Sequence, residues 1–237
     1  RIAPNDGVVP YDGPPSGIHG MGLFYDSSIE RRREMWENAV EAIAKIHSID
    51  ISSTPLPFQR TPHSLRDAVE DQLKVIDGWH AFGSPEPIPA LANATRILRN
   101  EIPDQDDIVL CWGDPKPGNI VYQDGQVVGV LDWEMSYLGT PEMDVMYWIV
   151  TDDVSASTFG VSRLAGCPGR DETIRYYEKL SGRTLRNLEY HELFQTLRLA
   201  VLLVLAARVI TDMGMAEHFP EHWSTNNEPY RRLLALM

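Results

Sequence analysis

The sequence has little cysteine and no long apolar run. Its two cysteines, Cys111 and Cys167, are too few for the disulfide framework of a small secreted protein. The longest apolar stretch, residues 199–207, holds nine residues, whereas a membrane-spanning helix needs ~20. These absences favour a reduced, cytoplasmic protein in which residues 199–207 form a buried core helix.

Positive charge is also scarce. The chain has 21 Lys+Arg against 34 Asp+Glu, a formal net charge of −13. Phosphate-rich surfaces repel a net anion, so we expect neither nucleic acid nor a membrane as a general partner. The apolar fraction of 43% over 237 residues excludes wholesale disorder and allows one large domain or two small ones.

Residues 1–25 hold five glycines and four prolines, a density that predicts a connector rather than a core element. Beyond them, apolar residues at three- and four-residue spacings predict helices. The expected helices begin after the caps at Asp26–Ser28 and at Ser64, and cover 88–102, 171–180, 188–211 and 228–236, with one more starting at Pro141.

The centre of the chain has a different period. An apolar run at 108–111 predicts a strand, and two β-prone runs flank Asp124-Gly125, a strong signal for a two-residue hairpin turn. We therefore expect an α+β fold, mainly helical, with one small central cluster of strands.

Three polar residues stand at the ends of these predicted strands. Asp114 and Asn119 lie five residues apart in a loop stiffened by two prolines, and Asp132 follows the return strand of the hairpin. Carboxylate and amide oxygens of this kind suit Mg²⁺, and a remaining carboxylate can accept a proton from a hydroxyl. Alone, Asp and Asn are common turn residues, so the hairpin context carries this interpretation.

The same stretches carry a family resemblance. Trp112-Gly-Asp-Pro-Lys-Pro-Gly-Asn119, Gly129-Val-Leu-Asp-Trp-Glu134 and Gly139-Thr-Pro-Glu-Met-Asp144 resemble the aminoglycoside phosphotransferase family, which has a protein-kinase-like fold. The resemblance implies that residues 26–237 are the C-terminal lobe of such a fold. Its catalytic loop would be 112–119 and its metal segment 131–134. Residues 1–25 would be the connector after the hinge, and the N-terminal lobe would lie outside this chain.

The resemblance also implies roles for single residues. Asp114 would be the catalytic base or would orient the attacking hydroxyl, while Asn119 and Asp132 would hold Mg²⁺ and with it ATP. Asp144 would brace the catalytic loop, and the role of Glu134 stays open between substrate and a second metal.

Two positions depart from the family pattern. Trp112 stands where the family often has a loop-bracing His, and Lys116 stands where it often has another His. A Lys so placed can offset charge on the transferred phosphoryl group, although an exposed lysine is the ordinary alternative.

We therefore expect an ATP- and Mg²⁺-dependent phosphotransferase acting on a hydroxyl of a small molecule, such as an aminoglycoside or amino alcohol. The alternative is a degenerate kinase-like domain that binds nucleotide or a partner without transfer, which Trp112 and the missing N-terminal lobe features favour. A metal-dependent phosphohydrolase is a third class.

Other residues that could belong to a functional site have simpler interpretations: Lys45 as a helix-surface lysine, Cys111 as a core-strand residue, and His218 and His222 as loop histidines.

Overall fold

The computed structural model describes residues 17–53, 62–105, 107–158, 160–218 and 220–237. It confirms a mainly helical α+β architecture with a few short strands. The chain divides into two compact units. One comprises residues 1–61 and 108–186, and the other comprises 62–107 and 187–237. The expected start at Arg1 and its connector up to residue 16 lie outside the described residues.

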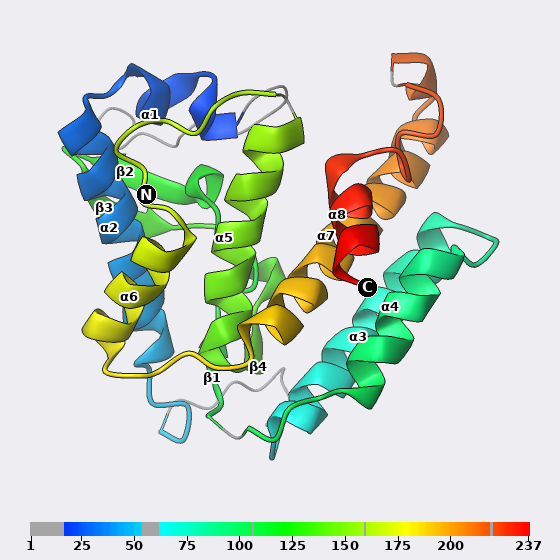
Figure 1. Ribbon diagram of the computed structural model, residues 1–237, viewed down its shortest axis with the longest axis horizontal. Coiled ribbons are helices and arrows are strands. Elements are labelled where there is room, and N and C mark those ends of the chain that lie inside the picture. The colour runs from blue at the N-terminus through cyan, green and yellow to red at the C-terminus, as the bar shows by residue number, and fades with distance from the viewer. Residues whose placement is uncertain (1–16, 54–61, 106, 159, 219) are drawn as a thin grey trace. The chain divides into compact units, whose positions relative to one another are not determined.

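The first unit combines helices with all the strands found in the described residues (Figure 1). Its helices are α1 (Gly22–Asp26), α2 (Ile29–His47), α5 (Pro141–Thr158) and α6 (Arg170–Ser181). Its strands are β1 (Val109–Cys111), β2 (Ile120–Gln123), β3 (Gln126–Val130) and β4 (Tyr137–Gly139).

The strands form two antiparallel pairs, β1 with β4 and β2 with β3. The β2–β3 turn is the predicted one: Asp124 and Gly125 have φ angles of 49° and 82°, as a type I′ turn requires at both central positions. Strand β4 was not predicted, because one of its three residues is Gly139 and glycine is depleted in strands.

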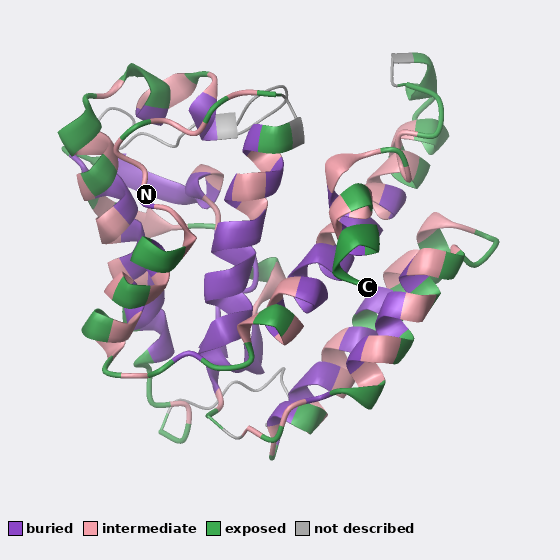
Figure 2. Cartoon of the chain, viewed as in Figure 1, coloured by how far each residue is buried: buried purple, intermediate pink, exposed green. Residues whose placement is uncertain are grey.

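Helix α2 forms where its sequence predicts. The Ser28 hydroxyl accepts the Arg31 N–H and caps the helix. The predicted apolar stripe is buried and contacts α6, β1, β3 and α5; it consists of Trp36, Ala39, Val40, Ile43, Ile46 and His47. Helix α5 is buried on every side over residues 141–150, which makes it the central helix of this unit (Figure 2).

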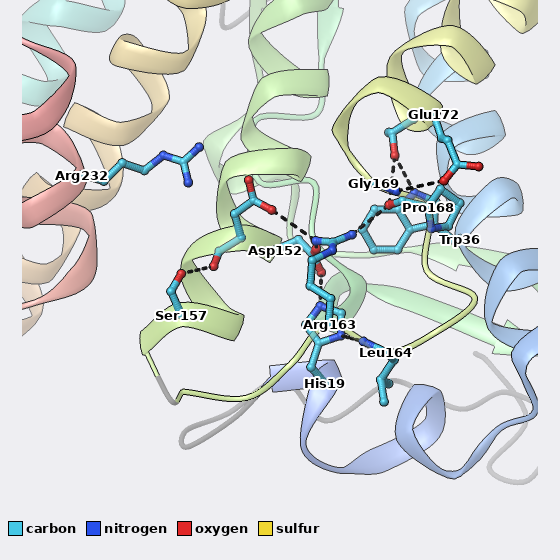
Figure 3. Close-up of polar contacts among 12 residues, drawn as sticks. His19, Trp36, Asp152, Ser157, Arg163, Leu164, Pro168, Gly169, Glu172 and Arg232 are labelled. Carbon is cyan, nitrogen blue, oxygen red and sulfur yellow. Dashed lines mark hydrogen bonds and ion pairs between the residues drawn. The ribbon is translucent and has the colours of Figure 1, made fainter.

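Residues 17–25 contribute to the core, contrary to the expectation of a mere connector. Ile18, His19 and Phe24 are buried. His19 Nε2 donates to Asp152 Oδ1 of α5 at 2.8 Å, and the Leu164 N–H donates to His19 Nδ1 at 3.2 Å (Figure 3). Arg163 pairs with Asp152 and lies over the Trp36 ring at 5.6 Å. The glycines of this segment thus prevent neither regular structure, a 3₁₀ turn at Gly17–His19 and helix α1, nor burial.

The second unit has no strand among its described residues, and its α-helices are α3 (Leu65–Gly83), α4 (Pro89–Asn100), α7 (Leu188–Asp212) and α8 (Glu228–Leu236). Helix α7 contacts the other three. The Tyr190 hydroxyl of α7 donates to Leu98 O of α4 at 3.0 Å, and Arg232 of α8 donates to Glu192 of α7 at 2.6 Å. Helices α4, α7 and α8 were predicted to within two residues at each end, and α3 begins directly after its predicted cap at Ser64.

By length and apolar composition α7 could cross a membrane, although half of its most apolar stretch is buried within the protein. Its buried side chains include the polar Gln195 and the charged Arg198 alongside Phe194 and Leu197. Within residues 199–207, which the sequence predicts to be a buried core helix, Ala200, Val201 and Val204 are buried and the other six residues are half-buried.

Candidate active site

The predicted catalytic loop connects β1 to β2 in the first unit, and the whole of residues 111–115 is buried. Gly113 has a φ of 90°, a conformation that favours glycine. Two prolines follow, and a short 3₁₀ turn over Pro117–Asn119 leads into β2. The loop is therefore fixed at both ends and stiff in between.

Asp114 lies at the centre of this loop with only 4% of its surface exposed. The Asn119 side-chain N–H₂ donates to Asp114 Oδ2 at 2.8 Å and to the Asp114 backbone carbonyl at 3.1 Å. Lys116 Nζ lies 3.1 Å from the same Oδ2. The other carboxylate oxygen, Oδ1, is buried and has no hydrogen-bond partner among the described residues.

Asp132 enters the site from the far end of the hairpin. The Leu131 N–H donates to Asn119 O at 2.8 Å, which extends the β2–β3 pairing and sets Asp132 next to the loop. Asp132 has φ 59° and ψ 63°, the left-handed region that non-glycine residues rarely adopt. The residue is exposed to solvent. Strain of this kind is frequent at functional sites, where it aims a side chain.

Strand β4 brings the predicted metal segment against the predicted catalytic loop. The loop follows β1, the segment 131–136 precedes β4, and Cys111 pairs with Tyr137. The approach is so close that a Cβ on Gly113 would lie 1.9 Å from Met135 O. The Trp112 indole N–H also donates to Leu131 O at 2.8 Å. Trp112 thus ties the loop to the segment that carries Asp132.

Asp144, in the first turn of α5, braces the loop as predicted. Its Oδ2 accepts the Trp112 backbone N–H at 2.6 Å, and its Oδ1 accepts the Gly113 N–H at 3.0 Å. Charge-assisted bonds of this length are among the stronger ones in proteins. The residue before Asp114 is therefore anchored to the buried central helix.

The structure brings Asp114, Lys116 and Asn119 into direct contact and places Asp132 beside them through the backbone. Glu134 is exposed in the turn Trp133–Met135. Cys111 is buried in β1, and Lys45 is exposed and paired with Glu41, both as predicted. Of the two loop histidines, His222 is exposed; the side chain of His218 lies outside the described residues.

Sequence reasoning missed one part of this site. His47 contacts Asp144 at 3.1 Å, and Tyr177 contacts His47 at 2.7 Å. From the sequence, its position at the end of the apolar stripe of α2 predicts only a core location. The available signal was a polar ring on a face that is otherwise apolar, which requires a buried partner.

Comparison with known proteins places this geometry in context. Residues 22–173 match the profile of the phosphotransferase enzyme family. Acyl-CoA dehydrogenase family member 11 of Gallus gallus is 28% identical over 186 residues, which cover 71% of this chain and 23% of that protein. The chain thus spans less than a quarter of the length of the curated relatives it matches.

Two solved structures share the fold. An aminoglycoside phosphotransferase homologue from Ralstonia eutropha has a TM-score of 0.72 at 22% identity, covering 97% of this chain and 68% of that one. Choline kinase from Streptococcus pneumoniae has a TM-score of 0.54 at 14% identity, covering 88% of this chain and 65% of that one. At these identities the likeness concerns the fold alone.

Proposed function

Because the chain belongs to the phosphotransferase enzyme family, we propose that it forms the catalytic lobe of a kinase that phosphorylates a hydroxyl of a small molecule, with ATP as donor. One observation carries the proposal. Asp114 is buried, its Oδ2 is held by Asn119 and Lys116, and its Oδ1 has no partner among the described residues. Once substrate binding uncovers this buried oxygen, a hydroxyl would find in Oδ1 a fixed acceptor for its proton.

The donor set fits Mg²⁺. Asn119 and Asp132 offer amide and carboxylate oxygens, the ligands that a hard cation prefers. The left-handed backbone of Asp132 and its exposure suit a residue that reaches toward an ion. When bound, Mg²⁺ would neutralise charge on the phosphates of ATP.

Side chains of the predicted catalytic loop would carry out proton transfer and charge stabilisation. Asp114 would orient the acceptor hydroxyl and receive its proton as the new oxygen–phosphorus bond forms and the bond to the leaving ADP oxygen breaks. Lys116, 3.1 Å from Asp114, would offset negative charge on the phosphoryl group in transit. Asp144 would keep the loop in place without reacting.

The proposal extends to the wider protein. Residues 26–237 would be the C-terminal lobe and residues 1–25 the connector that follows the hinge, with the lobe that covers ATP supplied from outside this chain. The coverage of 68% of the Ralstonia structure supports a chain that is part of a larger fold. We also propose a cytoplasmic location, where ATP would be available; the free thiols of Cys111 and Cys167 are in keeping with a reducing compartment.

We propose two classes of small molecule as acceptors of the phosphoryl group. The net charge of −13 favours a cationic molecule such as an aminoglycoside or an amino alcohol, in keeping with the choline kinase of similar fold. The names of the curated relatives favour a hydroxyl on an acyl chain, because those proteins are described as acyl-CoA dehydrogenase family members.

The alternative is a domain that binds nucleotide without transfer. Trp112 in place of the usual His favours it. Against it, Trp112 still ties the loop to the metal segment through its indole N–H. All three of Asp114, Asn119 and Asp132 are also present, and a pure binding module would not need Asp114 as an acceptor.

The test is phosphoryl transfer by the full-length protein to a panel of hydroxylated molecules from both classes. We expect Asp114→Asn to lower the rate by about 10²- to 10⁴-fold, the usual contribution of a general base. Asp124→Asn, an equivalent change in the exposed hairpin turn, should leave the rate unchanged. Equal rates in the wild type and Asp114→Asn would refute the role of Asp114. Phosphate release that needs no acceptor would favour the phosphohydrolase instead.

A further inference from the structure

His47 occupies an unusual position for a histidine at the end of a helix. It is the last residue of α2, and its ring is completely buried. Both ring nitrogens have partners. Nδ1 lies 2.7 Å from the Tyr177 hydroxyl of α6, and Nε2 lies 3.1 Å from Asp144 Oδ2 of α5. The ring therefore connects three helices of the first unit.

The network assigns the proton positions. Burial raises the pKa of Tyr177, so its hydroxyl stays protonated and can donate. A hydroxyl that donates to Nδ1 leaves the ring hydrogen on Nε2, and the Asp144 carboxylate that faces Nε2 can only accept it. Tyr177 then donates a hydrogen bond to His47, and His47 donates one to Asp144.

Asp144 needs such a donor. Its side chain is fully buried, and a buried carboxylate is costly unless hydrogen bonds satisfy it. Two of its bonds come from the backbone N–H groups of Trp112 and Gly113, and His47 supplies a third. The third bond is the one that ties the carboxylate to a helix outside the catalytic loop.

A metal site is the competing interpretation, because ligand atoms of His47, Cys111 and Asp144 lie within 4.8 Å of one another. Each of these atoms already has a protein partner. His47 uses both nitrogens, Asp144 accepts three bonds, and Cys111 Sγ lies 3.4 Å from Thr140 O. Hydrogen bonding accounts for the cluster without an ion.

We propose that His47 is a positioning residue: with its tautomer set by Tyr177, it orients Asp144, which in turn holds the backbone of Trp112 and Gly113 and so fixes Asp114. The inference rests on the proposed phosphotransferase function for its effect on rate. Its structural part stands independently of any acceptor.

Two variants of similar polarity separate this role from simple core packing. In His47→Gln the side-chain amide nitrogen takes the place of Nε2 and can still donate to Asp144. In His47→Asn the amide lies near the position of Nδ1 and does not reach Asp144. Both are made in the full-length protein, with His63→Asn as the control at an exposed histidine.

We expect His47→Asn to lower kcat by about 10- to 100-fold with KM for ATP unchanged, since a reacting group displaced by ~1 Å can cost on the order of 100-fold. Hydrogen exchange at the Trp112 and Gly113 amides should accelerate in the same variant. His47→Gln should restore both properties, and His63→Asn should alter neither. Equal behaviour of the Gln and Asn variants would overturn the proposal.

Tyr177→Phe removes only a hydroxyl. It tests the hydrogen bonds from Tyr177 through His47 to Asp144 even where a variant at position 47 fails to fold. Faster exchange at the two loop amides supports the proposal, and unchanged exchange overturns it. If the wild type transfers phosphoryl groups to no acceptor, the proposed function fails, whereas amide exchange still decides whether His47 positions the loop.

Discussion

At the scale of single residues, the carboxylate of Asp114 has two unlike oxygens. Oδ2 is engaged by an amide and an ammonium group, and Oδ1 is left without a partner in the described residues. The engaged oxygen fixes the orientation of the group, so the other is presented in one direction. A single short loop thus supplies both the acceptor and the means of aiming it.

Lys116 offers the sharpest test at this scale. We expect Lys116→Met to lower kcat by about 100-fold, the usual effect of removing one group that stabilises developing charge. Steady-state kinetics on the full-length protein would measure it. Lys45→Met is the matched control, because Lys45 is exposed and paired with Glu41 at 2.7 Å. Equal kinetics in both variants would show that Lys116 is an ordinary surface lysine.

Trp112 illustrates what residue identity alone can predict. The sequence shows a departure from the family pattern but not its consequence. In the structure the contact with Asp144 comes from the backbone of Trp112, which any residue type other than proline supplies, and the indole N–H reaches Leu131 O. A position that acts through its main chain tolerates the exchange of one side chain for another.

At the scale of elements, the site depends on two segments that pass each other closely. The catalytic loop and the segment before β4 approach at Gly113, where the backbone of Met135 leaves no room for a side chain. The pairing of β1 with β4 therefore determines the separation between the two segments, although each of these strands has only three residues.

We expect Gly113→Ala to lower the free energy of unfolding by at least about 2 kcal/mol, because it combines a positive φ with a backbone clash. Chemical denaturation would measure the loss. Gly78→Ala is the control: Gly78 lies within α3 with nothing within 4 Å of the added methyl group, so a gain of about 0.5–1 kcal/mol is expected. Equal stability of both variants would contradict the close approach.

Local patterns predicted the long helices and the hairpin because those signals lie within one segment. Ser28 and Ser64 cap α2 and α3 through bonds to residues three positions away. By contrast, the contact between His47 and Asp144 joins residues 97 positions apart. Spacing along the chain carries no information about such a contact, nor about the left-handed backbone of Asp132.

At the scale of the whole molecule, each unit holds a buried, neutral histidine. Burial, with the nearby charge of Arg163, lowers the pKa of His19 to about 4, and burial lowers the pKa of His191 to about 3. Both values lie below the ordinary 6.5 of an exposed histidine. The unfolded chain therefore binds more protons than the folded one below pH 6.5.

We expect the contribution of these histidines to stability to be complete above about pH 6.5 and to fall as the pH drops toward about 4. Each histidine should contribute a loss of about 2 kcal/mol between about pH 7 and pH 5. Urea denaturation at a series of pH values would measure the slope. His19→Gln should remove its share of that slope, and a flat profile over the same range would contradict the neutral state of both rings.

The candidate site was predictable at this scale because it is nearly continuous in sequence. Residues 112–144 carry the loop, the hairpin, the metal segment and the brace, and all of them belong to one unit. The family resemblance therefore selects these residues from the sequence alone, and their roles in catalysis and metal binding stay predictions. The second unit has no such motif, and its helices alone do not identify an acceptor.

The bond from the Trp112 indole to Leu131 O has a practical consequence. Labelling the protein with fluorotryptophan would give six ¹⁹F resonances, one for each tryptophan. The signal of Trp112 would be sensitive to any shift of the segment next to Asp132, because its N–H is bonded to that backbone at 2.8 Å. The residue that departs from the family pattern thus provides a built-in spectroscopic reporter, usable for nucleotide or metal titrations without knowledge of the acceptor.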